Sequence, residues 1–473
     1  MKKLIRSISL SLIVACGVLL SACGSEESDV ITLRVCNWEE YIDEGDWDED
    51  ELIELESGEW ILGSDPMVED FEEWYLETYG QEVKVEYSTF GTCEELYNML
   101  TIGDVYDIAS PSEYMIMKMM REGMVLPYSE KFRDESIEEN YYTKGLSPFL
   151  KERFENLSIN GEKLGDYAAG YMCGTLGIVY NPEEVSEEEA SHWSLMLDEN
   201  FNRRITIKDS VRDSYFGAIT HYYADELMSE EVLNAPDYQQ RIDDIINRTD
   251  PATVDAVEEV LSDMKDNVYS FETDAGKADM VTGKVVANMQ WSGDAVYTMD
   301  QADEDDVELC YATPEEGVNL WFDGWILLKE GISQDPRKQH AAEAFVNFLS
   351  RPDNVVRNMY YIGYTSAITG GDSDIILEYL DWTYGADEEE EEETVEYDVS
   401  TFFLGSGNYD DKYVITTTPD QTKRQLFAQY PPEEVLNKTV IMRCFEDEDN
   451  VRINRMWTNV RCFDLKELFS SKK

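Results

Sequence analysis

Two hydrophobic periods alternate along the first part of the chain. Apolar and polar residues alternate over 31–36 and 83–87, which predicts strands, and the run 106–109 predicts a third strand. Apolar residues spaced three and four apart predict helices over 67–79 and 94–102. Strand, helix, strand, helix, strand in this order indicates a parallel sheet with right-handed crossovers, so we expect an α/β fold.

Similar patterns continue to residue 349 and predict a second set of elements. Strands are expected at 205–207, 285–290, 307–311 and 321–328, and helices at 208–223, 256–264 and 337–349. We interpret the extended segment 177–182 as the crossover into a second lobe. The apolar run 321–328 is then a central strand that returns to the first lobe.

Two long acidic stretches, at 44–66 and 385–420, are interpreted as insertions. The seven consecutive acids at 387–393 repel one another, which favours a solvated loop over a site. A turn is expected at 362–366, and helical segments from 433 to 469 close the chain.

The chain opens with the pattern of a bacterial lipoprotein signal. Lys2, Lys3 and Arg6 precede an apolar run over 8–20, and small residues follow immediately before Cys23. We expect a signal peptide at 1–22, lipid on the Cys23 thiol and a polar tether at 23–30. The protein would then be held at the outer face of the cytoplasmic membrane. The alternative is an ordinary signal peptide cleaved at another position.

Composition limits the classes of partner. Hydrophobic residues make up 42% of the chain and aromatic residues 12%, which excludes global disorder. With 38 basic and 101 acidic residues, the formal net charge is −63. Such a surface disfavours nucleic acid and anionic lipid as partners and favours cations. Membrane contact is expected only through the lipid anchor, and part of the charge serves plain solvation.

Cysteines and histidines give no sign of a metal site. After the leader, six cysteines remain, with no C-x-x-C pair, and the three histidines are scattered. We therefore expect no metal and no cofactor. The six cysteines can form disulfides or stay as buried thiols, and their pairing is left open: Cys36, Cys93, Cys173, Cys310, Cys444 and Cys462.

Aromatic rings and carboxylates recur together where expected strands end or helices begin. They stand at 37–41, at 113–114, at 291–294 and at 321–325. In open α/β sheets, ligands bind at the carboxyl ends of strands. Rings that present a negative face, mixed with carboxylates, suit an organic cation. Alternatively, these rings are core or surface residues and the acids reflect a very acidic chain.

The same segments resemble the polyamine-binding proteins of bacterial ABC importers, the spermidine/putrescine type. The matching pieces occur in family order over most of residues 31–370: 37–41, 83–89, 106–114, 209–213, 290–295, 321–323, 345–352 and 362–364. The resemblance implies a two-lobed periplasmic-binding-protein-like fold of type II, each lobe a sheet flanked by helices, with hinge crossovers. Lobe 1 would comprise 31–168 and 321–372, and lobe 2 would comprise 169–320 and 373–473.

The resemblance also implies the residues that line the ligand site. Trp38 and Trp291 would be aromatic walls, and Asp213 and Asp323 would be ammonium partners. The remaining expected ligand-binding residues are Glu39, Tyr41, Ser112, Tyr114, Asp294, Trp321 and Tyr364. Asp294 matches an acid of putrescine-preferring members, and Ser210 replaces an acid of some spermidine-preferring ones, so both positions favour a short diamine.

The expected function is a lipid-anchored extracytoplasmic receptor, acting as a monomer, that delivers putrescine or spermidine to the permease subunits of an ABC importer. Two alternatives stay open. One is a receptor of the same fold for another solute, such as a sugar, an iron complex or a quaternary amine. The other is an extracellular hydrolase that uses two carboxylates, since aromatic and acidic clefts also bind sugars. No nucleophile elbow, zinc motif or phosphate loop supports another enzyme class, and we expect no catalysis.

Overall fold

The structure is a computed structural model that describes residues 30–48, 51–387 and 393–462. The expected signal peptide, the lipid site at Cys23 and nearly all of the tether lie outside the described residues. Most of the acidic run at 387–393 and the end of the segment 433–469 also lie outside them.

Strands of the described residues are β1 Ile31–Trp38, β2 Ile53–Glu54, β3 Trp60–Ile61, β4 Val83–Phe90, β5 Ile108–Ala109, β6 Val125–Leu126, β7 Ser158–Ile159, β8 Glu162–Lys163, β9 Ala168–Tyr180, β10 Ile205–Lys208, β11 Ser270–Glu272, β12 Ala287–Trp291, β13 Cys310–Ala312, β14 Val318–Leu328, β15 Thr365–Ser366, β16 Val395–Asp398, β17 Val414–Thr417 and β18 Thr439–Val440.

The helices are α1 Met67–Tyr79, α2 Cys93–Ile102, α3 Glu113–Arg121, α4 Tyr141–Gly145, α5 Pro148–Asn156, α6 Glu187–Ala190, α7 Val211–Tyr222, α8 Ala224–Leu227, α9 Glu230–Leu233, α10 Tyr238–Ile246, α11 Pro251–Asn267, α12 Ala275–Val281, α13 Ser292–Glu304, α14 Lys329–Ile332, α15 Lys338–Leu349, α16 Pro352–Ile362, α17 Ile375–Tyr384, α18 Ser400–Leu404, α19 Gln425–Gln429, α20 Glu433–Leu436 and α21 Asp447–Cys462.

One sheet joins the molecule. It runs in the order β11-β10-β12-β9-β14-β5-β1-β4, with β6, β13, β15 and β18 attached at its sides. Strand β1 pairs in parallel with β4 and with β5, which confirms the parallel sheet expected from the first alternation. The expected helix at 67–79 coincides with α1. At 362–366, where a turn was expected, α16 ends and β15 begins.

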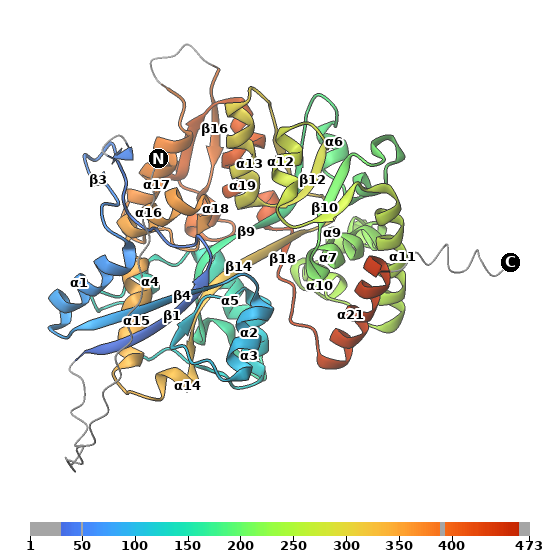
Figure 1. The fold of residues 1–473 in the computed structure, drawn as a ribbon. Helices are drawn as coiled ribbons and strands as arrows, with labels where there is room; N and C mark the ends of the chain where they lie inside the picture. Colours follow the sequence, from blue (N-terminus) through green and yellow to red (C-terminus); the bar gives the residue numbers. More distant parts are fainter. Residues whose placement is uncertain (1–29, 49–50, 388–392, 463–473) are drawn as a thin grey trace, which may run out of the picture.

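Strands β9 and β14 cross between the two halves of the molecule (Figure 1). They pair antiparallel over most of their length, with an irregularity between Asp323 and Gly324. Every residue of β9 is buried, because neighbouring strands and helices cover it on all sides. The crossings expected at 177–182 and 321–328 are thus parts of these two strands.

Separate apolar cores lie on either side of the crossing strands. The first is built around β1, β4, β5, α1, α3 and α15, and we call the part of the chain around it the first lobe. The second is built around β10, β12, α7, α10 and α11, with a smaller cluster under α13, and defines the second lobe. The lobe boundaries expected from sequence stay a prediction. Apolar side chains between Ile376 and Leu436, expected in lobe 2, mostly join the first core.

Four polar contacts of Arg357, on α16, hold the two ends of the first acidic insertion. Its guanidinium contacts the Asp43 carboxylate at 2.6 and 2.7 Å, Asp70 at 2.6 Å and the Asp65 carbonyl at 2.8 Å. Arg357 and Asp43 are buried. The insertion is therefore anchored to the first lobe by a buried ion pair just before its start and by the Asp65 carbonyl near its end, although much of its remainder is exposed.

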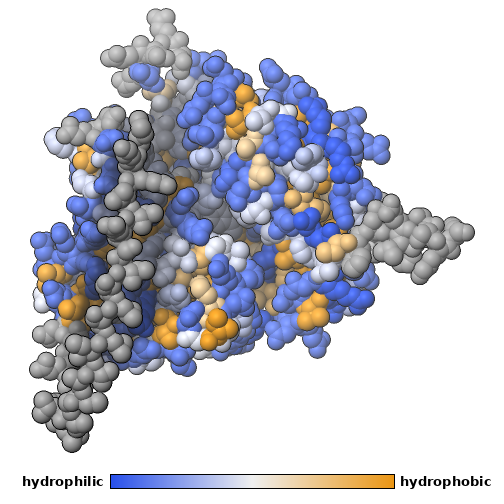
Figure 2. Space-filling model, viewed as in Figure 1, coloured by the Kyte–Doolittle hydropathy of each residue, from blue (hydrophilic) through white to orange (hydrophobic). Residues whose placement is uncertain are grey.

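The six cysteines of the described residues are free thiols. Four of them, Cys36, Cys93, Cys173 and Cys310, are buried, and none lies in a disulfide. The sequence left open whether these cysteines form disulfides or stay as thiols, and in the structure they are thiols. The face seen in Figure 2 is mostly hydrophilic, with small hydrophobic patches. None of the helices described has the length and apolar character needed to span a bilayer.

Replacing Arg357 by Met should lower the free energy of unfolding by about 3–5 kcal/mol, because Asp43 then stays buried without its cation. The matched control is Arg34→Met, which removes an ion pair with Glu86 at a half-exposed position and should cost less than about 1 kcal/mol. Urea unfolding of both variants measures the difference. Equal losses would show that the buried pair anchors nothing.

Candidate ligand-binding site

The centre of the site is Asp323, on the crossing strand β14 next to its irregularity with β9. Its side chain is buried, with 6% of the residue exposed. Ser112 Oγ donates to Oδ1 at 2.7 Å, and Tyr41 Oη donates to Oδ2 at 2.8 Å. Ser112 and Asp323 also form a backbone bridge, which fixes the start of α3 against β14.

Burial raises the pKa of Asp323 from 3.8 to about 6, although hydrogen bonds from Ser112, Tyr41 and Trp38 lower it. Asp323 is in no ion pair with a described residue. A carboxylate in this state has neutral donors but no countercharge. An ammonium ion is the kind of ligand that would supply one.

Aromatic rings surround this carboxylate. Tyr41 meets Tyr171 and Tyr364 edge to face, with ring centroids 5.7 and 5.6 Å apart. Tyr364 meets Trp321 in the same way at 5.5 Å. Trp321 and Asp323 are two apart on β14 and therefore lie on the same face of the strand. The rings thus form a continuous surface from Asp323 toward the second lobe.

The second lobe contributes Asp294, at the start of α13. Tyr364 Oη donates to its Oδ1 at 2.8 Å, across the boundary between the lobes. Unlike Asp323, Asp294 is paired: Lys277 Nζ lies 3.5 Å from Oδ1 and Lys208 Nζ lies 3.7 Å from Oδ2. Its neighbour Gly293 has no room for a side chain, because a Cβ there would lie 2.0 Å from the Tyr364 ring.

Lys208 is a buried cation of the protein itself. Its ammonium lies 4.2 Å from the centroid of the Trp291 ring and donates to the Thr273 carbonyl at 2.8 Å. Burial lowers its pKa, and the carboxylates of Asp294 and Glu272 oppose that shift. Part of the Trp291 ring therefore already serves an internal cation.

Asp213 lies beside the same indole, which donates from Nε1 to its Oδ1 at 3.3 Å. The Ser210 side chain caps α7 through the Asp213 amide. Burial raises the pKa of the Asp213 carboxyl, while its hydrogen bonds and the more distant charges of Lys208 and Arg212 lower it. No described residue forms an ion pair with it. Asp213 and Asp323 are therefore the two carboxylates of the site that lack a cation.

Arg212 joins the lobes on another side of the site. From α7 its guanidinium lies 4.3 Å from the Tyr114 ring and 3.9 Å from the Glu113 carboxylate, both on α3. It also donates to the Met442 carbonyl at 2.8 Å. Burial raises the pKa of Glu113 to about 7 despite this partner. The Tyr114 hydroxyl donates to Glu94 Oε1 at 3.1 Å.

The structure brings together most of the residues expected from sequence. Trp38, Tyr41, Ser112 and Asp323 form one cluster, and Asp213, Trp291, Asp294, Trp321 and Tyr364 form another that meets it at the Tyr41 and Tyr364 rings. Tyr114 and Glu39 do not join them: Tyr114 contacts Glu94 and Arg212, and Glu39 lies exposed in the turn after β1. That these residues bind a ligand stays a prediction.

Sequence reasoning missed the basic residues of the site. Lys208 ends the buried strand β10, where a lysine among apolar residues is unusual, and this was a usable signal. Lys277 had no such signal. Tyr171 was also missed, although its hydroxyl donates to the Tyr41 carbonyl at 2.8 Å.

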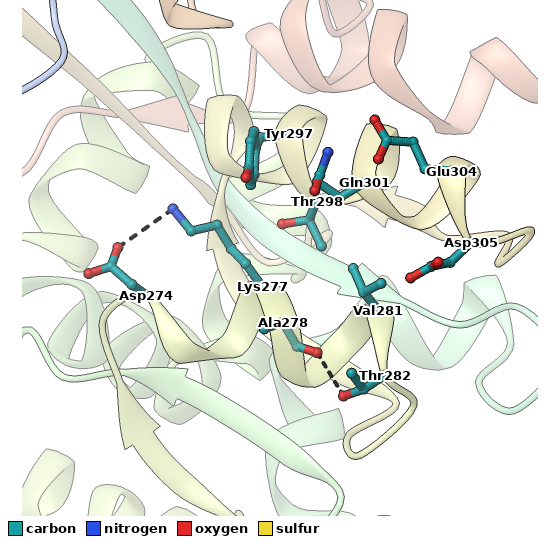
Figure 3. Close-up of a pocket in the computed structure, with 10 residues that line it drawn as sticks. All are labelled: Asp274, Lys277, Ala278, Val281, Thr282, Tyr297, Thr298, Gln301, Glu304 and Asp305. Atoms are coloured by element: carbon teal, nitrogen blue, oxygen red, sulfur yellow. Dashed lines mark hydrogen bonds and ion pairs between the residues drawn. The ribbon is translucent and has the colours of Figure 1, made fainter. Parts of the chain in front are cut away.

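A cavity of about 350 Å³ lies between α12 and α13, next to Lys277 (Figure 3). Lys277 and Asp274 stand at one end of it, and Glu304 and Asp305 at the other. The exposed ring of Tyr297 lies near the lysine end, 5.5 Å from the ammonium.

Comparison with known proteins finds a matching family model and several relatives of this chain. Residues 66–375 match the family model described as bacterial extracellular solute-binding protein. The spermidine/putrescine-binding periplasmic protein of Salmonella typhimurium is 25% identical over 355 residues, 75% of this chain and 82% of that protein. The putrescine-binding periplasmic protein PotF of Escherichia coli is 24% identical over 370 residues, 76% of this chain and 84% of that protein.

Solved structures agree on the fold. A spermidine/putrescine ABC transporter substrate-binding protein, PotD from Streptococcus pneumoniae, superposes with a TM-score of 0.57 at 21% identity, covering 91% of this chain and 98% of that one. A lipoprotein of Treponema pallidum, Tp0655, gives 0.58 at 16% identity, with 91% and 99% covered. The expected two-lobed α/β fold is confirmed by these likenesses.

Because burial raises the Asp323 pKa, Asp323→Asn should stabilise the protein at high pH. Between pH 4 and 6 the folded wild type holds a proton that the unfolded chain has lost, so its stability falls as pH rises through this window. The variant has no carboxyl group at this position and therefore no such loss. Its free energy of unfolding relative to that of the wild type should rise by roughly 1–3 kcal/mol between pH 4 and pH 8. Thermal melts of both proteins across this range test it; a gap independent of pH would contradict it.

Proposed function

The chain belongs to the family of bacterial extracellular solute-binding proteins, and we propose that it captures a polyamine, putrescine or spermidine, between its two lobes. The observation that supports this most is Asp323: a buried carboxylate, held by two hydroxyl donors and ringed by aromatic side chains, with no cation of its own. A ligand with an ammonium group completes that arrangement.

A protonated polyamine suits the rest of the site. Its ammonium groups would donate charge-assisted hydrogen bonds to Asp323 and Asp213, which are stronger than bonds between neutral groups. Its methylene groups would lie against the rings of Trp38, Tyr41 and Tyr364. Each contact between an ammonium and a ring adds about 0.5–2 kcal/mol. Binding thereby offsets the cost of burying two unpaired carboxylates.

The alternative ligands make poorer use of these groups. A neutral sugar would leave the charges of Asp213 and Asp323 buried without a counterion. A quaternary amine would bring charge but no N–H donor for their oxygens. The names of the relatives favour the same choice, since they bind spermidine or putrescine.

The family supplies the wider role that we propose. The protein would act outside the cytoplasmic membrane as a monomeric receptor without catalytic activity and would hand its polyamine to the permease subunits of an ABC importer. The lipoprotein pattern before Cys23 supports anchoring through lipid on that thiol.

Calorimetric titration of the wild-type protein with putrescine, spermidine, maltose and ferric citrate tests the ligand class. Saturable binding of a polyamine, with no heat from maltose or ferric citrate, is the expected result, because only the polyamines bring N–H donors on a positive charge. Tight binding of maltose without any response to polyamines would overturn the proposal.

Asp323→Asn should weaken putrescine binding by at least about 100-fold, the equivalent of about 2.8 kcal/mol, because an ammonium would be buried without its carboxylate. Asp372→Asn is the control, since it removes the same charge from an exposed position and should change the dissociation constant less than about twofold. Equal weakening by the two substitutions would show that bulk charge, and no specific site, attracts the ligand.

A further inference from the structure

The three aspartates of the site differ in whether the protein itself already neutralises them. Asp213 and Asp323 have no ion-pair partner among the described residues. Asp294 has two, Lys208 at 3.7 Å and Lys277 at 3.5 Å. A ligand with two ammonium groups would therefore pair with the two unpaired carboxylates. A third ammonium group would meet Asp294, which already pairs with two lysines.

The two lysines are not equivalent. Lys208 is fully buried and fixed by the Thr273 carbonyl, the Trp291 ring and two carboxylates, so it is a permanent part of the second lobe. Lys277 has a side chain that is 26% exposed, and its ammonium lies 3.5 Å from Asp294 and 3.6 Å from Asp274. It lies beside the cavity between α12 and α13, which offers it room to withdraw (Figure 3).

Lys277 stays charged at neutral pH. Burial lowers its pKa, but Asp294 and Asp274 outweigh that effect and raise it above 10.5. Its ammonium therefore presents a full positive charge on the Oδ1 side of Asp294, where Tyr364 also donates. An incoming ammonium at this carboxylate would meet repulsion from Lys277 or have to displace it.

We propose that Lys277 is a specificity-determining residue, a built-in ammonium that occupies Asp294 and makes the site prefer a diamine to a triamine. This inference rests on the proposed function. Displacement of Lys277 toward the cavity gives the triamine a way to bind at reduced affinity, because the contacts with Asp294 and Asp274 are lost. The expected effect is a preference, not an exclusion.

The experiment compares the dissociation constants of putrescine and spermidine for the wild type and for Lys277→Met. Methionine keeps most of the length and apolar volume of lysine and removes its charge. The wild type should bind putrescine more tightly. The variant should bind spermidine at least about tenfold more tightly than the wild type does, while putrescine changes less than about threefold. Melting temperatures without ligand establish that the variant is folded.

Two further variants separate specificity from general charge and from folding. Lys284→Met removes a lysine that pairs with Asp279 at 2.9 Å, away from Asp294, and should leave the ratio of the two constants unchanged. Lys277→Arg keeps the charge and should keep the preference for the diamine. If methionine prevents folding, Lys277→Gln replaces it in the same comparison.

The outcomes distinguish this inference from the proposed function. If the wild type binds neither polyamine, the proposed function falls and this inference falls with it. If both polyamines bind and Lys277→Met leaves their ratio unchanged, or if Lys284→Met changes it as much, the proposed role of Lys277 alone is overturned.

Discussion

A carboxylate buried without a cation is costly, and the candidate binding site is organised around one, that of Asp323. Two hydroxyl groups satisfy its oxygens but leave its charge unmatched. The folded protein tolerates this because the surrounding core is large and because β14 is held on both sides by paired strands. The free energy stored in the unmatched charge is available to a ligand that brings the missing cation. The affinity for a cationic ligand and the raised pKa of Asp323 would thus have the same physical origin, the burial of an unpaired carboxylate.

The crossing strands place the candidate site where a bound ligand would act on both lobes. Strand β14 carries Trp321 and Asp323 at the point where the first and second cores meet, and β9 runs beside it. Contacts from each lobe converge here: Tyr364 from the first lobe reaches Asp294 of the second, and Arg212 of the second reaches α3 of the first. A change in charge at this point acts on both lobes at once, which is what a receptor that closes on its ligand requires.

Sequence patterns predicted much of the fold and part of the site. Hydrophobic periodicity located α1 and the parallel sheet because these elements bury one regular face. Rings and acids at strand ends, together with the family resemblance, predicted Tyr41, Trp291 and Asp323, which the structure brings into the candidate site. Glu39, predicted in the same way, lies exposed, because the geometry of the turn after β1 decides which way its side chain faces. The pairing of Asp294 with Lys208 and Lys277 joins β10, α12 and α13. No local sequence pattern predicts a contact between three separate elements.

The free thiols of the described chain set the conditions under which this protein can fold. Disulfides stabilise many exported proteins, which then depend on an oxidising compartment and on enzymes that form the bonds. Here Cys36, Cys93, Cys173 and Cys310 are packed as small apolar residues, and the two lobes are stabilised without a disulfide among the described residues. The described fold therefore holds no covalent cross-link that a reductant could break, and its formation requires no oxidising compartment.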